Sequence, residues 1–125
     1  MAPFHSLPFE QRKRESERVL KKYEGKVPII IEPANKRQPA MKTGSKYLVS
    51  ADMTVQSLMY FVRKRIPSLQ VHEALWLFSI QYESGVKTPR TSVVPTSQSL
   101  GTVYHSNKSD DGFVYIHYSL ENTFG

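Results

Sequence analysis

The pattern of apolar residues in the first half of the chain predicts two strands followed by a helix. β-Branched residues dominate 26–33, and apolar residues recur in 46–50, as is typical of strands. Residues 55–65 then carry apolar side chains at helical spacing and end before Pro67, a helix breaker. Thr54 has the side chain of an N-cap for this helix. The order strand, strand, helix indicates a sheet crossed by a helix.

The second half of the chain predicts two further strands and a short helix. Residues 74–82 form an apolar run that is typical of a buried strand, and 113–119 form the last strand. Between them, 83–97 is rich in Ser, Thr, Gly and Pro and is expected to be a protruding loop. A short helix is expected at 98–104.

The N-terminal region is expected to be helical and basic. Pro3 and Pro8 bracket a segment of one or two turns, and 9–23 contains no Gly or Pro and mainly good helix formers. This helix has a thin apolar stripe, is otherwise covered by Lys and Arg, and should end near Gly25. The chain therefore predicts an α+β fold, whose order of elements also describes a ubiquitin-like β-grasp with two additional N-terminal helices.

The length of the chain fits one compact domain and leaves no room for a second of similar size. We expect a single ubiquitin-like domain over 1–125. Within it, 1–25 is the N-terminal helical extension, 26–119 is the ubiquitin-like core, and 120–125 is a flexible tail.

Composition narrows the classes of function. Cysteine is absent, which excludes disulfides and thiol nucleophiles and suits a reducing, cytoplasmic compartment. The net charge of +6 is uneven, because residues 1–65 carry +8 and residues 66–125 carry −2. A basic front half predicts an anionic partner: an acidic peptide, a phospholipid surface or a nucleic acid. Nucleic acid is not expected, because no strand interleaves aromatic and basic residues.

Residues capable of catalysis or metal binding do not form a recognisable pattern. No ligand spacing for a metal connects the four histidines, His5, His72, His105 and His117. No nucleophile motif or phosphate-binding glycine loop occurs, so we expect no enzyme activity and no cofactor. His117 is expected to be exposed on the last strand, and Trp76 to belong to the core. Asp110 and Asp111 are interpreted as turn formers.

The first two strands carry apolar residues on both faces, which is unusual for a half-buried strand. Pro28 and Ile30 point away from the core-facing residues of the first strand, and Leu48 does so beside Lys46 on the second. Either a helix covers this second face, or uncovered apolar spots form a docking groove. In the second case a peptide would add itself to the strand edge, with pockets for its side chains.

Four blocks of the chain together resemble the autophagy ubiquitin-like modifier family (GABARAP-type): LPFEQRKRESERVLKKYEGKVPIIIE, KYLVSADMTVQSLMYFVRKRI, EALWLF and the segment from VVPTSQSL to the final NTFG. They cover nearly the whole chain in the right order. The resemblance implies a ubiquitin-like fold with two hydrophobic pockets that capture an aromatic-x-x-aliphatic motif in cargo receptors and autophagy machinery.

The resemblance also assigns residues to the two pockets. The aromatic-accepting pocket is implied to be lined by Glu15, Val19, Pro28, Ile30, Lys46, Leu48 and Phe113. The aliphatic-accepting pocket is implied to be lined by Tyr47, Val49, Met53, Leu58, Phe61, Val62 and Arg65.

The resemblance further implies that the chain is conjugated through Gly125 to phosphatidylethanolamine. An autophagy cysteine protease exposes the glycine, and E1-like and E2-like enzymes then transfer it to the lipid. The implied localisation is cytoplasmic, and the autophagosome membrane once lipidated. An unbranched glycine suits this role because its carboxyl is unhindered. Attachment to proteins instead of lipid remains an alternative.

The chain departs from the family pattern in three places. The connection within 79–97 is several residues longer than usual, Ser50 stands where a proline is common, and Leu58 stands where an aromatic residue is common. The last two differences are expected to reshape the aliphatic pocket.

Overall fold

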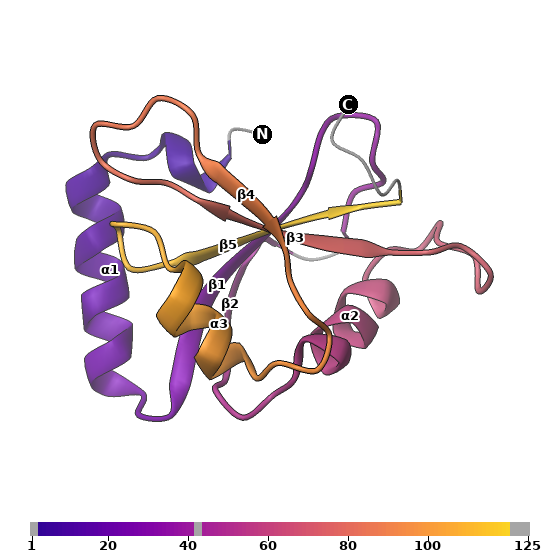
Figure 1. Ribbon diagram of the computed structural model, residues 1–125, viewed down its shortest axis with the longest axis horizontal. Coiled ribbons are helices and arrows are strands. Elements are labelled where there is room, and N and C mark those ends of the chain that lie inside the picture. The colour runs from indigo at the N-terminus through magenta and orange to yellow at the C-terminus, as the bar shows by residue number, and fades with distance from the viewer. Residues whose placement is uncertain (1–2, 42–43, 121–125) are drawn as a thin grey trace.

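A five-stranded sheet with helical elements on both faces forms the computed structural model (Figure 1), which describes residues 3–41 and 44–120. The elements are η1 (Phe4–Ser6), α1 (Phe9–Lys22), β1 (Lys26–Pro33), β2 (Lys46–Ser50), α2 (Val55–Lys64), β3 (Trp76–Gln81), β4 (Arg90–Val93), α3 (Leu100–Asn107) and β5 (Val114–Ser119). The α+β prediction is confirmed, and most predicted boundaries fall within two residues of these.

The strands lie in the order β2-β1-β5-β3-β4. β1 and β5 are parallel, with Ile31 opposite Ile116, and every other neighbouring pair is antiparallel. The first and last strands of the core therefore meet in the middle of the sheet, and β2 becomes the outermost strand at one side.

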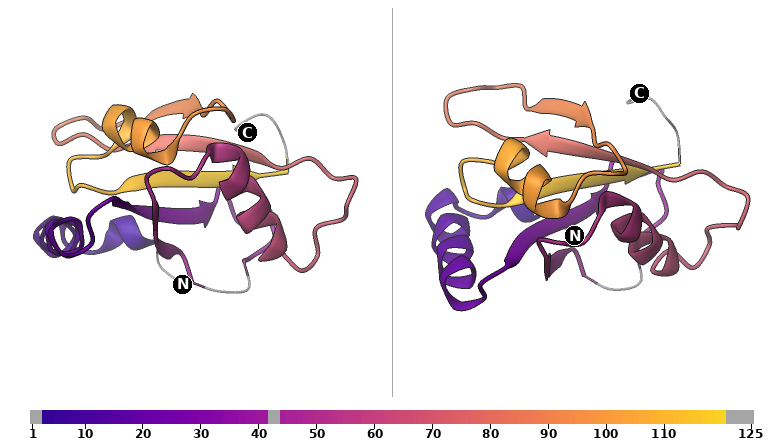
Figure 2. Two further views of the ribbon diagram at one scale, coloured as in Figure 1. Left: turned by 90° about the horizontal axis from the view of Figure 1, so that it is seen from below. Right: turned by 60° about the horizontal axis from the view of Figure 1, so that its bottom comes forward.

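The inner face of the sheet is covered by α2 and α3 (Figure 2), and their contact forms the main core. Each of these helices starts with a side-chain cap, and that of α2 is the predicted Thr54. Thr54 Oγ1 accepts the Ser57 backbone N–H at 3.1 Å, and Ser99 Oγ accepts that of Thr102 at 3.2 Å. Each such cap satisfies a backbone donor that the helix itself leaves unpaired, and contributes about 1 kcal/mol.

The outer face is covered by η1 and α1. Four buried residues form what we call the outer cluster: Ile30, Ile80, Phe113 and Tyr115. Alternation along β1 accounts for this second cluster, because Ile29 and Ile31 enter the main core while Ile30 points the other way. Two alternatives were considered for the second face of these strands: cover by a helix, or an open docking groove. At Ile30 the second face is covered.

Three expectations were wrong. The segment 83–97 is not simply a loop, because it contains β4, which pairs with β3 in an antiparallel hairpin. Its four residues, RTSV, carry too little periodicity to reveal a strand whose formation depends on β3 as a partner. Trp76 is 38 % exposed on the outer face and does not belong to the core. His117 is half-buried, because the outer face is partly covered at β5.

Within the described residues, no helix combines the length and the apolar character needed to cross a bilayer.

Candidate peptide-docking site

Residues implied to line the two pockets lie on either side of β2, the outermost strand of the sheet. We call the seven residues of the aromatic-accepting pocket the aromatic set, and the seven of the aliphatic-accepting pocket the aliphatic set. The aromatic set comes from α1, β1, β2 and Phe113, which directly precedes β5. The aliphatic set comes from β2, Met53 and α2 with its C-cap Arg65.

The aromatic set is brought together mainly by a surface ion pair and by the outer cluster. The Lys46 Nζ lies 2.7 Å from Glu15 Oε2, which ties β2 to α1. Ile30 and Phe113 are 0 % and 1 % exposed. The ring of Phe4 packs against this cluster, with its centroid 4.9 Å from that of Phe113 in an edge-to-face arrangement. These two buried members of the aromatic set therefore belong to a cluster against which an aromatic ring of the same chain already packs.

The aliphatic set is continuous with the main core. Leu58 and Val62 are fully buried, whereas Tyr47 and Phe61 are half-buried and meet edge to face at 5.1 Å. The Arg65 guanidinium lies 3.5 Å from the Phe61 ring centroid, and its Nη1 donates to the Phe61 carbonyl at 3.2 Å. This side thus presents partly exposed rings over a fully packed floor.

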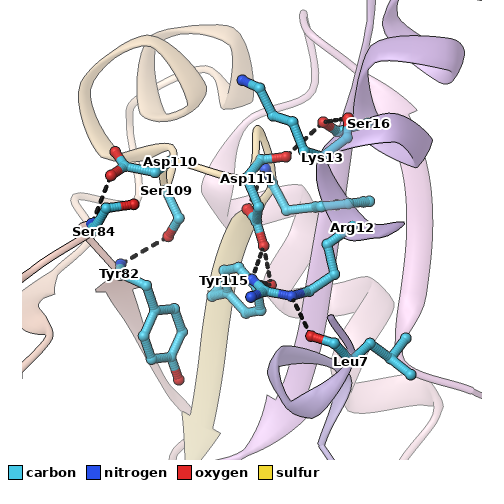
Figure 3. Close-up of polar contacts among 11 residues, drawn as sticks. Leu7, Arg12, Lys13, Ser16, Tyr82, Ser84, Ser109, Asp110, Asp111 and Tyr115 are labelled. Atoms are coloured by element: carbon cyan, nitrogen blue, oxygen red, sulfur yellow. Dashed lines mark hydrogen bonds and ion pairs between the residues drawn. The ribbon is translucent and has the colours of Figure 1, made fainter. Parts of the chain in front are cut away.

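A buried ion pair holds α1 on the outer face (Figure 3). The Arg12 Nη1 lies 2.6 Å from Asp111 Oδ2, and both side chains are buried. Asp111 also accepts the Tyr115 hydroxyl at Oδ2, and the Phe113 backbone N–H at Oδ1 at 3.0 Å. Burial, and then the bond to Asp111, raise the pKa of Tyr115, which therefore remains a hydroxyl donor. The carboxylate is fully paired, which is the condition for burying a charge without a large penalty.

The loop before β5 also approaches α1 closely. Ser16 Oγ donates to the Asp111 carbonyl at 2.6 Å, as Figure 3 shows. Gly112 has φ +87°, and a Cβ there would lie 2.3 Å from Ser16 Oγ. Only glycine fits both the backbone conformation and the close approach. This loop thereby sets where Glu15 and Val19 of the aromatic set lie over β1 and β2.

Sequence reasoning missed the role of Asp111. It was interpreted as a turn former, and it does lie in the turn before β5, yet its side chain is 1 % exposed and paired with Arg12. The two residues are 99 positions apart, so no local spacing relates them. A glycine directly after the aspartate was the only available signal, and it indicated only a turn.

The tail assigned to conjugation begins at the edge of the described residues. Leu120 donates its backbone N–H to Gln38 Oε1 at 2.8 Å, so the first residue of the predicted tail is bound to the domain. Gly125 lies outside the described residues.

A mixed sheet crossed by α2, with two helical elements placed before β1, defines a ubiquitin-like domain with an edge-strand site. The model of the family described as "Autophagy protein Atg8 ubiquitin like" matches residues 11–125. The chain is 41 % identical over 118 residues to autophagy-related protein 8 of Coccidioides immitis, covering 94 % of this chain and 92 % of that protein. It is 40 % identical to the proteins of the same name from Cochliobolus heterostrophus (strain C5) and Neurospora crassa, with 94 % of this chain covered and 90 % and 88 % of theirs. The chain belongs to the Atg8 ubiquitin-like family of autophagy proteins.

Proposed function

We propose that this protein is a lipid-conjugated peptide receptor of autophagy. In this proposal, Gly125 is joined to phosphatidylethanolamine on autophagosomal membranes. The domain then recruits cargo receptors and autophagy machinery by binding aromatic-x-x-aliphatic motifs. The role needs a binding surface and a free carboxyl terminus, and no catalytic group.

The position of β2 is the observation that carries the peptide-binding half of the proposal. It is the outermost strand and pairs with β1 on one side only. In that pairing Ser50 lies opposite Lys26, and Lys46 lies opposite Ile30. A peptide that pairs with an outermost strand gains backbone hydrogen bonds, and alternate side chains point to opposite faces. The aromatic and aliphatic sets lie on those two sides of β2, which supports a ligand with two apolar residues in a fixed spacing.

Charge near β2 supports a ligand with acidic residues beside its aromatic anchor. Lys46 is exposed at the start of β2, and α1 carries several further basic side chains. Because Lys46 is already paired with Glu15, an acidic peptide residue has to compete with that carboxylate. We therefore expect acidic flanking residues to contribute modestly, within the range of about 1 kcal/mol that exposed ion pairs reach.

The conjugation half of the proposal rests on family membership and on the tail. Six residues from Leu120 can span about 20 Å, enough for the carboxyl group to enter an enzyme active site away from the domain. A protease, an E1-like and an E2-like enzyme would supply the thiols that this chain lacks. Two acyl chains anchor a protein stably, at about 0.8 kcal/mol per buried methylene.

Lipid conjugation is tested by reconstitution with the E1-like and E2-like enzymes, ATP and phosphatidylethanolamine liposomes. Mass spectrometry should find one lipid on Gly125, and Gly125→Ala should form none while still binding peptide. If enzymes that act on a control substrate produced a protein adduct and no lipid adduct, the chain would instead be a modifier of proteins.

Peptide binding is tested by calorimetry with an aromatic-x-x-aliphatic peptide. Leu48→Ala should weaken binding about tenfold, because Leu48 lies on β2 within the aromatic set and is only partly buried. The control is Val71→Ala, since Val71 is 98 % exposed and belongs to neither set. Equal affinity of the two variants would remove β2 from the binding site.

A further inference from the structure

The ring of Phe4 lies where the aromatic anchor of a bound peptide is expected. Three observations place it there. Its centroid is 4.9 Å from that of Phe113, the Lys46 Nζ is 5.9 Å from its centroid, and it packs against the cluster that includes Ile30. Phe113, Lys46 and Ile30 all belong to the aromatic set.

The contacts of the Phe4 ring are of the kind that would bind the aromatic residue of a peptide. Its face lies toward an ammonium group and its neighbour meets it edge on, two contacts that favour aromatic rings over aliphatic side chains. The backbone N–H of Phe4 also donates to Glu32 Oε2 at 3.0 Å, a charge-assisted bond to the side chain of a β1 residue. The chain therefore supplies its own aromatic residue to this part of the outer face.

Few contacts hold η1, the segment that carries Phe4, on the outer face of the sheet. η1 has a single turn and no buried residue. Beyond Phe4, the segment is held by His5, which stacks on Tyr82 at 3.6 Å and meets the Tyr115 ring edge on at 5.8 Å, and by the bond from Arg12 Nε to the carbonyl of its C-cap Leu7 at 2.9 Å. In contrast, α1 is fixed by the buried pair of Arg12. Release of the segment therefore does not require α1 to move.

We propose that Phe4 is an intramolecular competitor for the aromatic pocket, so that an aromatic-x-x-aliphatic peptide binds only after η1 has swung away from the outer cluster. The proposal rests on the peptide-binding function proposed above. Apparent affinity is then the intrinsic affinity multiplied by the fraction of molecules in which Phe4 is displaced. Ligands without an aromatic anchor do not compete with Phe4. An aromatic ligand has to displace Phe4, so only those with enough intrinsic affinity bind.

The test compares Phe4→Ala with Leu7→Ala by calorimetry. Leu7 belongs to the same segment, is 39 % exposed and is not packed against the outer cluster, which makes it a matched control. Phe4→Ala should bind the aromatic-x-x-aliphatic peptide about tenfold more tightly than the wild type, and Leu7→Ala should match the wild type. A second peptide with alanine in place of its aromatic residue should bind both variants equally.

The possible outcomes separate this inference from the function on which it rests. If the wild type binds the peptide and Phe4→Ala binds it equally or more weakly, Phe4 is a wall of the site or irrelevant to it, and the inference is overturned. If neither the wild type nor the folded Phe4→Ala variant binds, the proposed peptide-binding function fails.

A measurement on the unaltered chain guards against an unstable variant. In the wild type, NMR should show Phe4 ring protons shifted by the neighbouring Phe113 ring, and this shift should disappear as peptide saturates the site. Retention of the shift at saturation would overturn the inference.

Discussion

The two sides of the proposed peptide site are built in different ways. The aliphatic set lies within residues 47–65, on a strand and the helix that directly follows it. The aromatic set extends from Glu15 to Phe113 and depends on α1, which docks through a loop near the other end of the chain. One side is therefore formed by a contiguous unit, and the other exists only when distant segments meet.

This difference teaches where the site is vulnerable. The aliphatic side shares its floor with the main core, so it persists as long as the domain is folded. The aromatic side depends on a few specific contacts between α1 and the turn before β5. Changes to those contacts should impair binding of the aromatic anchor well before the domain unfolds.

The largest effect is expected from removing the buried carboxylate. Asp111→Ala leaves Arg12 buried without its counter-ion and two further donors unpaired, which should cost about 3–5 kcal/mol in the free energy of unfolding. Urea denaturation measures this cost. Glu83→Ala is the control, because its ion pair with Arg90 is exposed and longer, at 3.5 Å, and should cost less than about 1 kcal/mol. Similar costs for the two variants would show that α1 is not held by Asp111.

Acid should act on the outer face more than on the inner one. Burial lowers the pKa of His117 to about 4, and burial followed by the charge of Arg12 lowers the pKa of His5. Both side chains lie on the outer side of the sheet. A histidine with a lowered folded-state pKa stabilises the fold fully above about pH 6.5, and this contribution is lost as the pH falls toward the folded-state value.

For His117 the loss between pH 6.5 and pH 4 is at most roughly 3 kcal/mol. Denaturation curves over this range measure it, and His117→Gln should remove most of the dependence. A wild type with constant stability down to pH 4 would contradict the prediction.

A smaller effect is expected at the glycine beside α1. Gly112→Ala has to adopt φ +87° and also displace Ser16, which together should cost about 2–3 kcal/mol. Gly85→Ala is a matched control, because its φ is +82° but nothing lies within 4 Å of a new Cβ. The control should cost only about 1 kcal/mol. The difference between the two losses in the free energy of unfolding measures the contribution of the close contact between Gly112 and Ser16 of α1. Equal losses would show that this contact has no effect on stability.

The smallest effect is expected on the aliphatic side. Arg65→Ala removes the guanidinium that lies over Phe61, a contact worth about 0.5–1 kcal/mol at a partly exposed position. Peptide affinity should fall two- to fivefold, with no change for a peptide whose aliphatic anchor is replaced by alanine. A comparable loss with both peptides would show that Arg65 does not act through the aliphatic anchor.

Most of the fold could be predicted from the chain, because its elements have strong local signals. The runs at 26–33 and 46–50 coincide with β1 and β2, and Thr54 caps α2 as predicted. β4 could not be predicted in this way, since four residues without clear alternation become a strand only when β3 offers hydrogen bonds. Trp76 was misplaced for a related reason: an apolar run does not say which of its faces the sheet leaves uncovered.

The candidate site, like the fold, was predicted from the sequence only in part. The family resemblance named the residues of both sets, and the periodicity of β1 alone indicated that Ile30 faces away from the main core. Only the tertiary structure decided what covers Ile30, because burial depends on segments distant in the chain, here Phe4 and the helix held by Asp111. The sequence by itself determined which elements form and which faces are apolar. Contacts over 28 to 99 residues, which no local period encodes, decided which of those faces stays open.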